Sequence, residues 1–286
     1  MSLRTAPAFI GQIVVTTGLN DVVYWREDDG GAGVHDLSAT LTPGTYWPAL
    51  LIQHVANEMT TESGSSGNTN TYTGTFVVST GIMKLARTGG ASDWYPKVTT
   101  AETVNVLTGG VVDTTSNTSA LSVGQYGANH LGWLIATSSP ALSDVHTADQ
   151  TCAHTWIPSL PPAMDSEEQY ERTVIEAIAM DGSGEVYSFS DWQVSASEFP
   201  LYGGDWQRRT LRFDRMTQAD TTWYLSQWWG PHAGAGGKFR YYPDKTVATY
   251  YTCRLTGDSM RKASRGARLI GYALWSIPLE MRRAPA

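Results

Sequence analysis

The sequence predicts a mainly β protein of the α+β class. Short alternations of apolar and polar residues, as in residues 9–15 and 75–78, recur between segments rich in Thr, Ser and Gly. This pattern is typical of strands joined by turns. The apolar fraction of 41% and the aromatic fraction of 11% are enough for buried cores and argue against disorder. A length of 286 residues allows one large domain or two ordinary ones.

Residues 1–153 are expected to form a β-rich domain with one amphipathic helix. The helix begins at Pro48, because proline suits the first helical turn, and it ends in the polar segment 60–71. Four apolar residues recur on one stripe of this helix: Leu51, Ile52, Val55 and Met59. A further strand is expected over residues 81–87. Residues 154–169, HTWIPSLPPAMDSEEQ, are expected to be a linker, since proline-rich polar segments connect domains better than they form them.

Residues 170–286 are expected to form a β-sandwich or a partly open barrel with one helix packed across it. The predicted strands cover residues 173–180, 186–192, 209–214, 238–242, 250–255 and 272–281. The helix covers residues 217–230. Thr217 with Asp220 resembles a capping box at its start, and Gly230 followed by Pro231 ends it.

Two groups of aromatic residues in this second domain could form a contact surface. The helix carries aromatic residues all round rather than on one stripe: Trp223, Tyr224, Trp228 and Trp229. Such a helix is buried on several sides or against a partner. The segment 236–255, GGKFRYYPDKTVATYYTCRL, is expected to be a hairpin around a Pro-Asp-Lys turn.

Because side chains alternate along a strand, this hairpin has two unlike faces. One face is expected to be core: Phe239, Tyr241, Tyr251 and Cys253. The other is expected to point outward: Arg240, Tyr242, Tyr250 and Arg254. Tyrosine with arginine is the composition that interface centres favour. A solvated strand face, with tyrosines supplying β propensity, is the alternative.

The charge is distributed unevenly along the chain. Residues 1–150 have a net charge of -7, residues 151–205 of -9, and residues 206–286 of +9. This split suits either nucleic-acid binding or contact with the acidic surface of another copy. The acidic remainder of the chain disfavours a polyanion, because it would repel one from any nearby surface.

The motifs of common enzymes are missing from the sequence, so no enzymatic activity and no cofactor are expected. The best metal candidate lies in residues 144–154: Asp144, His146, Asp149, Cys152 and His154. Its spacing matches no familiar zinc site, so a polar loop without metal is expected instead. Cys152 and Cys253 are too few for a disulfide framework and are expected to be reduced.

The 11 tryptophans allow a carbohydrate-binding interpretation, since an aromatic plane suits the apolar face of a sugar. The candidates in the first half are Trp25, Trp47, Trp94 and Trp133. Burial in a core is the more common use of tryptophan. The sequence has no apolar run long enough to span a bilayer and no recognisable signal peptide, so synthesis and assembly in the cytoplasm are expected.

The order of elements in residues 165–286 resembles the tail proteins of long-tailed bacterial viruses. The resemblance lies in a basic strand (RRTLRFDRM), a short aromatic helix, the hairpin GGKFRYYPD and YYTCRL, and a closing YALWSIPLEMRR. In the first half, TLTPGTYWPALLIQHVANEM, HLGW and HTADQT resemble an accessory domain of the same class of proteins. Trp133, where that domain more often has Phe, is a departure from the pattern.

The resemblance implies a structural virion protein, a distal tail protein that forms a hexameric ring between the tail tube and the tail-tip hub. Its partners would be further copies of itself, the tube protein and the hub proteins, with DNA only passing through the lumen. The subunit interface would use the outward hairpin residues together with the helix: Arg240, Tyr242, Tyr250, Arg254, Trp228 and Trp229. The alternative is a tail module that binds a carbohydrate receptor, such as a host surface glycan, through the N-terminal domain.

Overall fold

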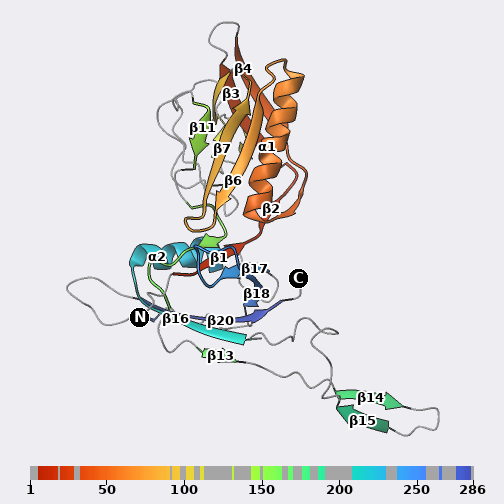
Figure 1. The fold of residues 1–286 in the computed structure, drawn as a ribbon, viewed down its shortest axis with the longest axis vertical. Coiled ribbons are helices and arrows are strands. Elements are labelled where there is room, and N and C mark those ends of the chain that lie inside the picture. The colour runs from red at the N-terminus through yellow and green to blue at the C-terminus, as the bar shows by residue number, and fades with distance from the viewer. Residues whose placement is uncertain are drawn as a thin grey trace.

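The chain is mainly β, as the sequence predicts. The computed structural model describes residues 6–18, 20–28, 33–90, 92–96, 101–105, 110–112, 131, 143–148, 151–162, 167–169, 176–180, 186–190, 208–229, 237–255, 264–265 and 275–284. The described elements form an upper and a lower module along the long axis of the molecule (Figure 1). A separate hairpin pairs β14 (Glu176–Met180) with β15 (Val186–Ser190).

The upper module packs one helix against small, mainly antiparallel sheets, in which only the described pair β3–β9 is parallel. Its strands are β2 (Ile13–Val15), β3 (Val22–Asp28), β4 (Val34–Thr40), β5 (Gly44–Tyr46), β6 (Thr71–Val77), β7 (Ile82–Gly89), β8 (Asp93–Pro96), β9 (Ala101–Asn105), β10 (Gly110–Val112) and β11 (Val145–Thr147). The sheets run β10-β9-β3-β4 with β8 also on β3, β11-β7-β6, and β2-β5. Helix α1 (Pro48–Ser65) packs mainly against β6 and also contacts β4 and β7.

Helix α1 buries the stripe that the sequence predicts and ends at Ser65, within the polar segment 60–71 where the sequence places its end. The polar residues of its last turns are held by the sheets. Thr60 Oγ1 accepts a hydrogen bond from the backbone N–H of Tyr72, and the buried Ser63 donates to Glu27. One bond to a strand backbone and one to a strand side chain therefore hold the last turns of the helix in place.

Glycine at position 74 lets α1 lie close to β6. A Cβ atom added to Gly74 would lie 2.2 Å from the carbonyl oxygen of Ile52, which is backbone and cannot move aside. Close approach of two backbones is one of the uses of glycine inside a strand. By contrast, a Cβ on Gly64, in the helix itself, would meet nothing within 4 Å.

We expect Gly74→Ala to lower the free energy of unfolding by about 1–3 kcal/mol, because the methyl group overpacks the contact between helix and strand. Gly64→Ala is the matched control and should raise stability by up to about 1 kcal/mol, since alanine is the better helix former. Urea unfolding followed by circular dichroism measures both. Equal effects of the two substitutions would contradict the close packing.

A buried carboxylate ties α1 to the sheets. Glu27 is fully buried. Its Oε1 accepts hydrogen bonds from Trp25 Nε1 at 2.9 Å and from Tyr72 OH at 2.5 Å. Its Oε2 accepts from Ser63 Oγ at 3.0 Å and from Asn68 Nδ2 at 2.8 Å. Burial, together with the hydrogen bond to Glu27, raises the pKa of Tyr72, so the phenol stays protonated and keeps donating.

Glu27→Ala should lower the free energy of unfolding by about 3 kcal/mol or more, because it leaves several buried donors without an acceptor. Tyr72→Phe, which removes one donor and keeps the ring, should cost only about 1 kcal/mol. Thermal and urea unfolding of the two variants test the difference. The network would be unimportant if Glu27→Ala were no more harmful than Tyr72→Phe.

The lower module is an eight-stranded sheet curled into a half-barrel. Its order is β12-β1-β17-β18-β20-β16-β13, with β19 also on β20. The strands are β1 (Ala8–Gly11), β12 (Thr155–Trp156), β13 (Glu167–Gln169), β16 (Arg208–Met216), β17 (Phe239–Tyr242), β18 (Tyr251–Leu255), β19 (Ser264–Arg265) and β20 (Trp275–Arg283). Arg209 of β16 donates to the hydroxyl of Tyr241 on β17 at 2.9 Å. The hydrogen bond joins strands that are not neighbours in the sheet, as the curl allows.

A helical segment packs against this sheet, as predicted. Helix α2 (Gln218–Trp223) continues into a π-helical turn over Tyr224–Trp229. Thr217 caps it, because its side chain accepts a hydrogen bond from the backbone N–H of Asp220 at 3.1 Å. The predicted capping box is therefore confirmed at its main bond.

The predicted domain boundaries are wrong at two places. Strand β1 belongs to the lower sheet, where it pairs with β17 and β12, although residues 1–153 were expected to form one N-terminal domain. Phe9 explains this, since its ring stacks on Trp156 at 5.0 Å and on Tyr241 at 5.3 Å. Residues 154–169 were expected to be a linker, but they supply β12 and β13 to the same sheet.

Candidate subunit interface

The hairpin of β17 and β18 has the alternation that the sequence predicts. Phe239 pairs with Cys253, and Tyr241 pairs with Tyr251. Phe239, Tyr241 and Cys253 are buried in the lower core, and the half-buried Tyr251 packs against that core. The inner face is therefore confirmed. Burial raises the pKa of Tyr241, and the neighbouring Arg209 opposes the shift.

Part of the outer face is covered by the chain itself. Tyr242 is only 5% exposed. It packs with Ala8 and Ile10 of β1, and Phe76 and Val78 of the upper module pack against the same cluster. The placement of Tyr242 in a subunit interface is therefore wrong, because its contacts are made between the two modules of one chain.

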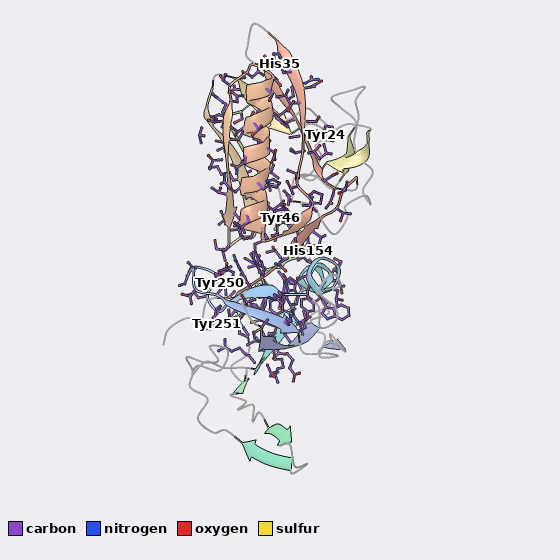
Figure 2. The ribbon with its side chains drawn as sticks, turned by 90° about the vertical axis from the view of Figure 1, so that its right-hand side faces the viewer. Tyr24, His35, Tyr46, His154, Tyr250 and Tyr251 are labelled. Carbon is purple, nitrogen blue, oxygen red and sulfur yellow. The ribbon has the colours of Figure 1, made fainter. Side chains whose placement is uncertain are left out.

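Arg240 completes this junction between the modules. Its guanidinium carbon lies 4.3 Å from the ring centroid of Trp47, the residue that precedes α1, and 4.4 Å from that of Tyr250. Figure 2 shows Tyr250 at the level where the two modules meet. The cation therefore stacks between an aromatic ring of each module, and it too serves a contact within the chain.

Replacing Arg240 by Ala should lower the free energy of unfolding by about 1–2 kcal/mol, because two cation–π contacts at a partly desolvated site are lost. Arg212→Ala, on an exposed surface of the same sheet, should change it by less than about 0.5 kcal/mol. Urea unfolding of both variants measures the difference. If both substitutions changed the free energy of unfolding by equally small amounts, other contacts would hold the junction.

The two tryptophans of the helical segment differ from the expectation and from each other. Trp228 is fully buried in its own lower core, 5.0 Å from the ring of Phe239 and 5.5 Å from that of Phe9. Its placement in a subunit interface is therefore wrong. Trp229 packs against the same core but is only partly buried, so it still presents surface beside the helix.

The rest of the predicted outer face lies at the surface. Tyr250 is 42% exposed, and Arg254 is half-buried. Next to Tyr250 in the sequence, residues 245–248 and the residues Val78 and Ser79 line a cleft of about 400 Å³. The cleft lies between a turn of the upper module and the β17–β18 loop of the lower module.

The residues considered for a metal site serve other contacts. His146 Nε2 lies 2.5 Å from the carbonyl oxygen of Trp94, and Cys152 Sγ lies 3.1 Å from Thr155 Oγ1. Burial raises the pKa of Cys152 to about 12, so its thiol stays protonated. Asp149 lies outside the described residues. Among the residues that the structure describes, no group of three or more His, Cys, Asp or Glu side chains could hold a metal ion.

Most of the tryptophans considered for sugar stacking already pack against other residues of the chain. Trp25 and Trp94 are fully buried in the upper core, so they are not available for the alternative of stacking on sugars. Trp47 stacks on Arg240, and Trp133 lies outside the described residues.

The sequence analysis missed an alignment of arginines across the lower sheet. Arg208, Arg282 and Arg254 come from three neighbouring strands and lie directly opposite one another. The doublets at 208–209 and 282–283 were the available signal, but their pairing depends on the order of the strands in the sheet. No protein-family model, curated protein or solved structure matches the chain. Within the described residues, no helix is both long enough and apolar enough to cross a bilayer.

Proposed function

We propose that this chain is a structural, non-enzymatic protein of the tail of a long-tailed bacterial virus. It forms a ring, expected to be hexameric, at the distal end of the tail tube and connects the tube to the tail-tip hub. Its partners are further copies of itself and the tube and hub proteins above and below it. Its place is the tail of the virion, assembled in the cytoplasm of the host.

The observation that supports this proposal most is the order of elements in the lower module. A basic strand (β16) leads through the aromatic helical segment into the hairpin of β17 and β18, and the last strand, β20, ends in two arginines and pairs with both β18 and β16. This is the order on which the resemblance to tail proteins rests. The half-barrel with a helical segment packed against it agrees with a mainly β ring subunit.

The surface of the lower module offers what a ring subunit needs. A closed ring uses two different surfaces of each subunit in a head-to-tail contact. Tyr250, Trp229 and Arg254 keep exposed surface beside the basic strands. The residues that sequence analysis placed with them, Tyr242 and Trp228, serve instead to fix the subunit's own shape.

The purified full-length chain should form closed rings in negative-stain images, with six-fold symmetry in two-dimensional class averages. Sedimentation velocity over a range of protein concentrations should show the corresponding oligomer, because the proposed contact is an equilibrium between copies. A monomer at every concentration, without rings on the grids, would overturn the proposal.

A further inference from the structure

The cleft of about 400 Å³ lies between the turn that joins β6 to β7 and the loop that joins β17 to β18. Val78 and Ser79 line it from the upper module, and residues 245–248 line it from the lower module. Figure 2 shows Tyr250, which follows this loop, at the level where the two modules meet. Small-molecule sites are commonly clefts of about 300–1,000 Å³ between domains. The place and the size of the cleft therefore suit a small ligand.

Both walls of the cleft are held by contacts within the chain. Val78 packs against the apolar cluster that joins β1 to β17. On the other wall, the backbone N–H of Lys245 donates to the carbonyl oxygen of Ala6 at 3.3 Å, and that of Val247 donates to the carbonyl oxygen of Asp244 at 3.1 Å. A ligand that enters the cleft does not have to order these walls first, which lowers the cost of binding.

Lys245 gives the cleft a positive charge. Its side chain is partly buried. Among the residues that the structure describes, no acidic side chain forms an ion pair with it. The neighbouring Asp244 instead accepts hydrogen bonds at its Oδ1 from the backbone N–H and the hydroxyl of Thr246, at 2.8 and 2.6 Å. One lysine balances the single charge of a carboxylate, whereas a phosphate group carries more charge and more acceptor oxygens. The cleft therefore favours a carboxylate.

Two hydroxyl groups accompany this charge. The hydroxyl of Ser79 has no hydrogen-bond partner among the described residues. That of Thr246 donates to Asp244 and keeps its own lone pairs for a donor. The remaining lining residues are aliphatic, and one of them, Val247, is 48% exposed. The cleft thus combines one cation, two hydroxyl groups and an apolar wall.

From these observations we infer that the cleft binds a small hydroxylated carboxylate of the sugar-acid class. Its carboxylate pairs with Lys245, its hydroxyl groups meet those of Ser79 and Thr246, and its C–H groups pack on Val247. An acidic peptide supplies the charge but has fewer hydroxyl groups to match. Because both walls belong to one chain, this site does not depend on the proposed ring.

Binding of glucuronate to the full-length chain tests the site. In ¹H–¹⁵N spectra, sodium glucuronate should shift the amide signals of residues 78–79 and 245–248 saturably, and glucose, which lacks the carboxylate, should bind about tenfold more weakly or worse. Lys245→Gln should weaken glucuronate binding about tenfold or more, because it removes a charge-assisted hydrogen bond. Lys84→Gln removes the same charge from an exposed position of β7 outside the cleft, so it is the matched control and should bind like the wild type.

A second variant separates a sugar acid from a plain carboxylate. Ser79→Ala should weaken glucuronate binding about threefold or more and leave the binding of butyrate unchanged, because butyrate has no hydroxyl group. Bound glucuronate should also raise the melting temperature of the wild type, but not that of Lys245→Gln. An oligosaccharide that ends in glucuronate, compared with the free acid, distinguishes a glycan from a metabolite, and tighter binding of either supports the inference. Circular dichroism checks that both variants fold.

Each other outcome overturns the inference. If glucuronate caused no saturable shifts at the cleft up to its solubility limit, or if Lys84→Gln lost as much binding as Lys245→Gln, the cleft would not be its site. Equal binding of butyrate and glucuronate would remove the role of the hydroxyl groups. A glutamate-rich peptide that shifted the same signals at lower concentrations than glucuronate would make the occupant a protein.

Discussion

The structure depends on one short strand, β1, being paired on both sides. Its four residues lie between β12 and β17 in the lower sheet. Phe9 fills the lower core, while Ala8 and Ile10 face the upper module. Strand β2 of the upper module begins two residues after the end of β1. Removing β1 would therefore open the lower sheet and strip the junction of its apolar contacts at the same time.

Local patterns were sufficient to predict much of this fold. The stripe of α1, the cap at Thr217 and the register of the β17–β18 hairpin depend on residues close together in the sequence. Periodicity and turn chemistry report such relations directly. The segment 9–15 shows the limit, since one apolar alternation became two strands in different modules. No local pattern states which sheet a short strand joins.

The candidate interface was harder to predict for a physical reason. A junction between modules, a buried core and a contact between subunits all favour aromatic residues and arginine, because each needs large apolar area with a few polar groups. Tyr242 and Trp228 satisfy that need inside one chain, whereas Tyr250 contacts Arg240 and still stays 42% exposed. The alignment of Arg208, Arg282 and Arg254 was missed for a different reason, since it exists only once β16, β20 and β18 are neighbours.

The pairing of β1 with β17 also affects how the protein is made. A ribosome synthesises residues 8–11 near the beginning and residues 239–242 near the end, so β1 waits through almost the whole of translation for its partner. The upper module, whose described core comes from residues 13–152, can pack during this time. Until β17 is made, at least one edge of the apolar strand β1 stays unpaired and open to wrong pairing with other nascent chains. Slow completion of the lower sheet is therefore the step at which a chaperone would help this protein most.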